Sequence, residues 1–136
     1  MFVIMFFCFL DLKRGWLEYC NAGHSPPVIG TADGHFSFLE TEPNVPIGLW
    51  PDQDYEGTVI DNLAYHRILL YTDGLNEAEN RQQEQYGEDC IISFLTARAS
   101  FNAHDIIEAL KADVENFRDG AEPSDDLTLF AFHYND

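Results

Sequence analysis

The hydrophobic pattern changes its period partway along the chain, and this change constrains the fold more than any other feature of the sequence. Up to about residue 72, apolar residues form short runs separated by Gly, Pro, Asn and Asp, which is typical of strands joined by turns. From Glu88 onward, apolar residues recur at helical spacing, at Ile91, Ile92, Leu95 and Ala97. Strands grouped ahead of helices indicate an α+β fold with antiparallel sheets.

Turn signals place the individual elements. Lys13-Arg14-Gly15 and Ala32-Asp33-Gly34 each predict a hairpin, and Asp33 is expected to be a turn residue only. A helix is expected to begin after Asn102, a good N-cap residue, and to pack one apolar stripe into the core. That stripe consists of Ile106, Ile107, Leu110, Val114 and Phe117. A closing strand is expected from the segment DDLTLFAFHY, residues 125–134.

The N-terminal run Phe2–Leu10 is apolar at nearly every position. It is about half the length that a membrane-spanning helix needs, and it has no basic n-region or cleavage site. We interpret it as a core strand covered on both faces, which predicts a central place in a sheet. Because a natural domain seldom begins with its most buried strand, we expect Met1 to be internal to a larger domain.

Composition excludes several classes of protein. A chain of 136 residues with 46% hydrophobic residues has enough material for one core. Its 24 acidic and 7 basic residues give a formal net charge of -17, which argues against nucleic acid and membrane-surface partners and suits divalent cations. The 3 cysteines form no C-x-x-C pair, so we expect neither a zinc site nor disulfides, and a cytoplasmic location is the default.

Acidic residues occur where two apolar strands meet loops. Asp73 follows the run Ile68–Tyr71, and Asp125 and Asp126 precede the last strand. If these strands are antiparallel neighbours, the carboxylates converge on one rim of the sheet, where Mg²⁺ or Mn²⁺ would neutralise them. Taken one at a time, each residue is better explained as an ordinary turn or cap residue.

Five segments in a fixed order resemble a known family. They are MFVIMFFCFLDLKRGWLEYCNAGHSPP, PIGL, LLYTDGLNEAEN, YGED and SDDLTLFAF. This order is similar to the C-terminal two-thirds or so of PPM (protein phosphatase 2C-like) Ser/Thr phosphatases of the bacterial sporulation, SpoIIE-like branch. The resemblance implies that residues 1–136 are the C-terminal portion of a single phosphatase domain with an α-β-β-α sandwich fold, N-terminally incomplete here.

The resemblance also implies roles for individual residues. Asp73 matches the family's strand-end metal ligand, with Gly74 leaving room at the metal, and Asp125 matches its terminal ligand, with Asp126 beside it. Asp73 and Asp125 are thereby the expected catalytic pair, and all three aspartates the expected ligands of a two-metal Mn²⁺ or Mg²⁺ centre. His24 is expected in a structural or outer-sphere role. In the segment NVPIGL, residues 44–49, the proline and glycine are expected to pack against backbone.

The complete enzyme implied by this resemblance hydrolyses phosphoserine or phosphothreonine on a phosphorylated anti-sigma-factor antagonist, often under an N-terminal sensor or receiver domain. However, the family's D-x-x-G-H-G-type segment, which carries another metal-binding Asp, does not precede Met1. A non-catalytic protein-binding module, or degenerate phosphatase, is therefore the alternative. A haloacid-dehalogenase-type phosphatase would need an acidic residue where Leu75 occurs, and a calcium-binding loop motif is absent.

Overall fold

The computed structural model describes residues 1–42, 44–123 and 125–135. In this part of the chain there are seven strands and three helices, in the order β1 (Met5–Asp11), β2 (Trp16–Ala22), β3 (Val28–Gly30), β4 (Phe36–Phe38), β5 (Thr58–Ile60), β6 (Arg67–Tyr71), α1 (Asp73–Asn76), α2 (Gly87–Ala97), α3 (Ala103–Arg118) and β7 (Leu129–His133). The predicted order of hairpin strands, helices and a closing strand is confirmed.

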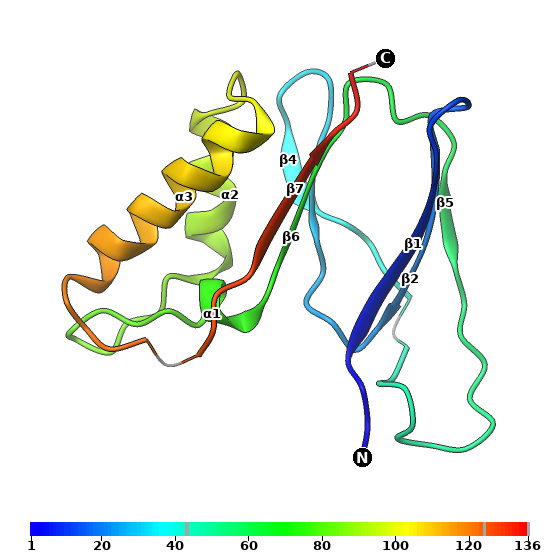
Figure 1. Ribbon diagram of the computed structural model, residues 1–136, viewed down its shortest axis with the longest axis horizontal. Helices are drawn as coiled ribbons and strands as arrows, with labels where there is room; N and C mark the ends of the chain where they lie inside the picture. The colour runs from blue at the N-terminus through cyan, green and yellow to red at the C-terminus, as the bar shows by residue number, and fades with distance from the viewer. Residues whose placement is uncertain (43, 124, 136) are drawn as a thin grey trace.

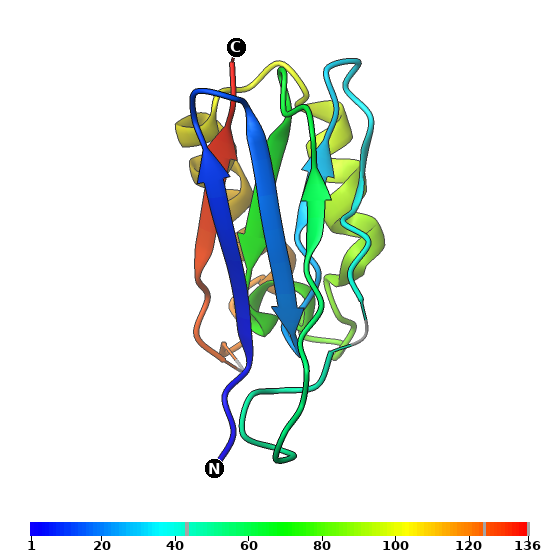
Figure 2. The same ribbon diagram turned by 90° about the vertical axis from the view of Figure 1, so that its right-hand side faces the viewer.

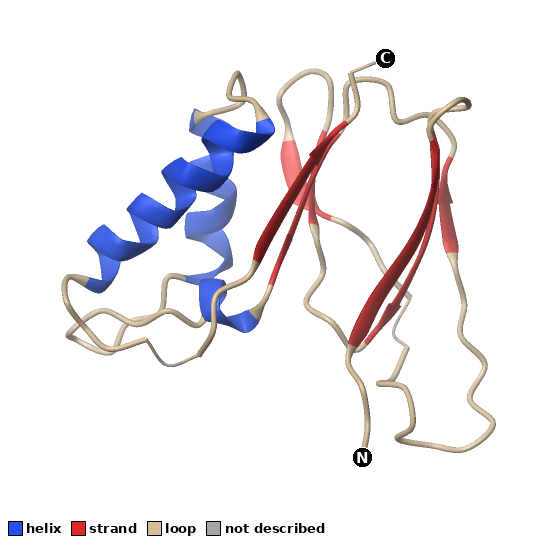
Figure 3. Cartoon of the chain, viewed as in Figure 1, coloured by secondary structure: helices blue, strands red, loops and turns tan. Residues whose placement is uncertain are grey.

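The elements form three layers. One sheet has the strand order β4-β3-β6-β7 and the other has the order β1-β2-β5. Helices α2 and α3 cover the outer face of the four-stranded sheet, and the three-stranded sheet packs on its inner face (Figures 1 and 3). Every strand pairing within the two sheets is antiparallel, as the sequence predicts. The second helical layer of the predicted α-β-β-α sandwich has no counterpart among the described residues.

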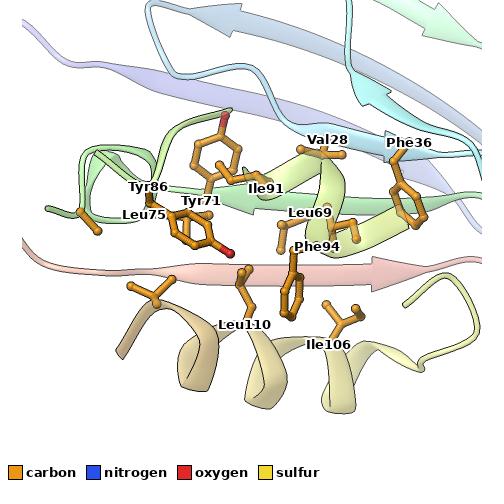
Figure 4. Packing of buried hydrophobic residues seen from close by; sticks show 13 residues of the cluster. Val28, Phe36, Leu69, Tyr71, Leu75, Tyr86, Ile91, Phe94, Ile106 and Leu110 are labelled. Carbon is orange, nitrogen blue, oxygen red and sulfur yellow. The ribbon is translucent and has the colours of Figure 1, made fainter. Parts of the chain in front are cut away.

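Strand β6 is buried on both faces. Leu69 and Tyr71 pack into the cluster beneath the helices, which includes Leu75, Ile91 and Leu110 (Figure 4). Ile68 points the other way, into a second cluster between the two sheets. Alternate side chains of β6 therefore enter two different cores, which explains why its sequence is a continuous apolar run.

The prediction that the N-terminal run is a central strand is wrong for the part of the chain that is described. Strand β1 lies at the edge of its sheet and pairs with β2 alone. Phe6 and Leu10 pack between the sheets, whereas Phe7 and Phe9 on the opposite face are 64% and 61% exposed. Figure 2 shows this open face of the β1-β2-β5 sheet toward the viewer, with the helices behind the other sheet. In the described part of the chain, the apolar face that carries Phe7 and Phe9 is therefore uncovered.

The helix predictions are confirmed. The Asn102 side chain caps α3 by accepting a hydrogen bond from the Asp105 backbone N–H at 2.8 Å. Within the predicted stripe, Ile106, Leu110 and Val114 are fully buried. Across the residues that the structure describes, every helix is too short or too polar to span a lipid bilayer.

Candidate metal centre

The acidic loops meet at one end of the four-stranded sheet. In the register of β6 and β7, Tyr71 is opposite Leu129, so the end of one strand lies beside the start of the other. The loop after β2 reaches the same end, near α1 (Figure 1). Asp73 and Asp125 line a common pocket of about 340 Å³ together with His24, Ser25 and other residues. The predicted convergence of these two carboxylates on one rim is confirmed.

Thr72 ties the two acidic segments together. Its backbone N–H donates to the Thr128 carbonyl at 3.1 Å, and its hydroxyl accepts from the Thr128 N–H at 3.0 Å. The same hydroxyl donates to the Asp126 carbonyl at 3.2 Å. These bonds extend the β6–β7 pairing by one residue beyond the strands, so the two carboxylates of the pocket are held on adjoining segments.

Asp73 begins a short helix, which the sequence did not predict. Thr72 is the N-cap of α1, and the Leu75 N–H donates to the Thr72 carbonyl at 2.9 Å. The physical reason for this turn is Leu75, whose side chain is completely buried in the cluster beneath the helices. The chain must fold back at once after β6 to bury it, and this leaves Asp73 exposed at the rim.

The interpretation of Gly74 needs correction. A Cβ atom at this position would lie 2.2 Å from the carbonyl oxygen of Asp126 and 3.0 Å from the Cα of Leu127. The space that Gly74 leaves is therefore filled by the backbone of the opposite acidic segment, rather than kept open for a metal. Because Gly74 has no side chain, the segment of Asp73 and the segment of Asp125 and Asp126 can approach each other. This approach brings Asp73 and Asp125 to the same pocket.

The two aspartates before β7 differ in their contacts. The Asp125 carboxylate accepts a hydrogen bond from the Asp126 N–H at 2.8 Å, as expected for a local turn, while it also lines the pocket. Asp126 is anchored by its backbone carbonyl, through Thr72, and its side chain is exposed. Ser124, which opens the motif SDDLT, lies outside the described residues. Asp73 and Asp125 are thus the two aspartates that line the pocket. A ligand role for Asp126 stays a prediction.

One polar contact of the site was missed by sequence reasoning. The Ser25 hydroxyl donates to Asp73 Oδ1 at 2.9 Å, across 48 positions of sequence. The segment NAGHSPP was expected to form a turn near the site, but nothing in its sequence indicates which side chain reaches the carboxylate. His24 is half-buried and its Nδ1 lies 2.8 Å from the Ser25 carbonyl, which agrees with the expected structural role.

Proline and glycine residues near this turn have the packing roles expected for them. A Cβ on Gly23 would lie 2.7 Å from Cγ of Pro46, so the proline ring rests against the glycine backbone. Gly48 has a φ of 88°, and a Cβ there would lie 3.1 Å from the Met1 carbonyl oxygen. Asp33 is likewise a turn residue, since its carboxylate accepts hydrogen bonds from the Thr31 hydroxyl and the His35 N–H.

The pocket suits a hydrated divalent cation. Among the residues that the structure describes, no group of three or more His, Cys, Asp or Glu side chains is placed to hold a metal ion. Two carboxylates on one pocket wall still match the way Mg²⁺ is usually bound, through one or two carboxylates with water as the other ligands. Near the site, burial, followed by the charges of Glu88 and Asp73, raises the pKa of Tyr71 to about 12.

Curated proteins with similar sequences include the following two. Protein IcfG of Synechocystis sp. is 30% identical over 138 residues, which cover 99% of this chain and 21% of that protein. Phosphoserine phosphatase RsbP of Bacillus subtilis is 33% identical over 66 residues, covering 48% of this chain and 16% of RsbP. The chain therefore spans about a fifth of the length of each of these relatives, or less.

Structural comparison gives the class of the fold. The SiaA-PP2C domain of Pseudomonas aeruginosa superposes with a TM-score of 0.81 at 21% identity, covering 97% of this chain and 52% of that one. The α+β sandwich is thus the fold of PP2C-type phosphatase domains. Residues 1–135 match the profile of the family described as Stage II sporulation protein E (SpoIIE). The chain belongs to the SpoIIE family.

Proposed function

We propose that this chain is the C-terminal portion of a single SpoIIE-like phosphatase domain that hydrolyses phosphoserine or phosphothreonine in proteins. The observation that carries the proposal is the meeting of Asp73 and Asp125 on the wall of one pocket, from segments 52 positions apart (125 − 73) that pair only through the fold. The name of the relative RsbP, a phosphoserine phosphatase, supports the same reaction.

In this proposal Asp73 and Asp125 hold Mn²⁺ or Mg²⁺, and Asp126 is a third candidate ligand. A bound divalent cation supplies Lewis acidity and a more acidic water for attack on a phosphate monoester. The residues of this chain contribute placement: the hydrogen bonds of Thr72 hold the two acidic segments together, and the bond from Ser25 orients one carboxylate. The centre of the complete domain needs further ligands, which we assign to an upstream segment on the family resemblance.

The substrate we propose is a phosphorylated anti-sigma-factor antagonist, as the family resemblance implies. A protein substrate is consistent with the open form of the site, where both Asp73 and Asp125 are exposed to solvent. We also propose that an upstream sensor or receiver domain controls the activity, and that the enzyme works in the cytoplasm.

A second candidate is a non-catalytic protein-binding module. It is favoured by one observation, that the described residues contain no cluster of three potential metal ligands. A degenerate phosphatase would keep the fold and lose the chemistry, which the next experiment tests.

The test is Mn²⁺-dependent hydrolysis of p-nitrophenyl phosphate and of a phosphoserine peptide. It uses this chain and a longer protein that includes the upstream segment, each with Asp73→Asn and Asp125→Asn variants. Asp33→Asn is the matched control, because Asp33 is an exposed turn residue in the β3–β4 hairpin. We expect activity in the longer protein that both site variants abolish and the control retains. Inactivity of the longer protein with bound Mn²⁺ would favour the binding module.

A further inference from the structure

We propose that Ser25 is the positioning residue of Asp73, setting the orientation in which this carboxylate receives a divalent cation. The inference rests on the metal site proposed above and adds to it a residue from a different strand connection. The Ser25 hydroxyl has one strong acceptor in the structure, Asp73 Oδ1 at 2.9 Å. This bond uses Oδ1, and among the described residues no side chain donates a hydrogen bond to Oδ2, which is therefore available to a cation.

Asp73 needs such a contact because little else restrains its side chain. It is exposed, at the first position of a helix of only four residues. An exposed carboxylate samples several rotamers, and a cation would have to restrict it on binding, at an entropic cost. A hydrogen bond from a fixed neighbour restricts the rotamer beforehand, as the outer-sphere partners of metal ligands usually do.

Ser25 is itself held by a buried anchor. Asn21, only 6% exposed, accepts a hydrogen bond from the His24 N–H and donates another to the His24 carbonyl, both at 2.8 Å. The Asn21 side chain thus binds both the N–H and the carbonyl of His24, the residue just before Ser25. The turn requires a φ of 79° at Gly23, and Pro46 packs on that glycine from outside.

The His24 ring adds a further tie to the same residue. Its Nδ1 lies 2.8 Å from the Ser25 carbonyl. Since a carbonyl oxygen only accepts hydrogen bonds, Nδ1 carries the proton and donates it. The backbone around Ser25 is therefore restrained by the Asn21 side chain and by the His24 ring. These contacts fix the segment from which the Ser25 hydroxyl reaches the pocket.

The experiment measures the affinity for Mn²⁺ of the longer protein that includes the upstream segment, by titration that follows the electron paramagnetic resonance signal of the free ion. The decisive pair of variants is Ser25→Thr and Ser25→Val, which match in shape and differ in the hydroxyl. Ser25→Ala is a third variant, and Ser37→Ala, at the exposed position of β4, is the control for loss of a serine. Urea unfolding of each variant reports whether the fold is retained.

We expect Ser25→Val and Ser25→Ala to weaken Mn²⁺ binding about tenfold, the low end of the effect of removing an outer-sphere partner. Ser25→Thr and Ser37→Ala should bind as the unaltered longer protein does. Equal affinities of Ser25→Thr and Ser25→Val would overturn the inference, since only the hydroxyl distinguishes them. Absence of Mn²⁺ binding to the unaltered longer protein would refute the metal site itself, whereas Mn²⁺ binding that is unaffected by the Ser25 variants would refute this inference alone.

Discussion

Replacement of Gly74 by alanine tests the close approach on which the site depends. The added Cβ would lie 2.2 Å from the Asp126 carbonyl oxygen and 2.7 Å from its carbonyl carbon. Favourable contacts between heavy atoms begin at roughly 3.5 Å, so the Asp126 backbone would have to withdraw by about 1 Å. The obstructing atoms belong to the backbone, and no side-chain rotation relieves the clash.

The direction of the effect follows from comparing the opposing contributions. Alanine in place of glycine stabilises a helix by up to about 1 kcal/mol, through helix propensity and a less flexible unfolded chain. Overpacking of this kind costs about 1–3 kcal/mol. Because α1 has only four residues, its gain is small. We expect Gly74→Ala to lower the free energy of unfolding by about 1–2 kcal/mol and to weaken Mn²⁺ binding through the displaced Asp125 segment.

The assay is urea unfolding followed by tryptophan fluorescence, together with the Mn²⁺ titration. Gly57→Ala is the matched control: its added Cβ would meet its nearest atom, the Tyr19 carbonyl oxygen, at 3.4 Å, an ordinary contact. This variant should be as stable as the unaltered chain. A Gly74→Ala protein with unchanged stability and unchanged Mn²⁺ affinity would refute the argument that the two acidic segments touch at this glycine.

Three further variants address other parts of the fold. Asn102→Ala should lower the free energy of unfolding by about 1 kcal/mol through loss of the α3 cap, while Asn102→Asp should retain it in the same urea assay. Tyr71→Phe should leave stability unchanged or raise it by up to about 1 kcal/mol in thermal unfolding, because the buried Tyr71 hydroxyl has no partner among the described residues. Burial, followed by the nearby Arg67, lowers the pKa of His133 below its usual value of 6.5. The unfolded chain therefore binds this proton more readily, so His133 supports stability above pH 6.5 and this support is lost as the pH falls. Urea midpoints at pH 7.5 and 5.5 should differ less in His133→Gln, and an equal difference would exclude His133 as the source.

Much of the fold was predictable because its elements carry local signals. Asn102 ahead of a helical stripe and Ala32-Asp33-Gly34 between two apolar runs produced the cap and the hairpin as expected. These features depend on a few neighbouring residues, whose backbone preferences act over a single turn. The short helix α1 was missed because its cause, the burial of Leu75, depends on a core that forms far away in sequence.

The number of faces that a strand buries was not predictable from its apolar content. Both the N-terminal run and β6 are nearly all apolar, yet Phe7 of β1 is exposed and Leu69 of β6 is buried. Their difference lies in their neighbours: β1 is an edge strand, and β6 lies inside its sheet between β3 and β7. Hydrophobicity reports that a residue can be buried, whereas the layers of the fold decide whether it is.

The candidate site likewise has features that local sequence predicts and features that depend on the fold. The amino-acid sequence is enough to place Asp73 and Asp125 at strand boundaries, and it carries the motifs of the SpoIIE family. The folded chain is needed to show that both aspartates line one pocket, that the Asp126 backbone packs against Gly74, and that Ser25 donates a hydrogen bond to Asp73. Strand ends and caps arise from adjacent residues, whereas contacts across about 50 positions exist only once the sheet has paired β6 with β3 and with β7.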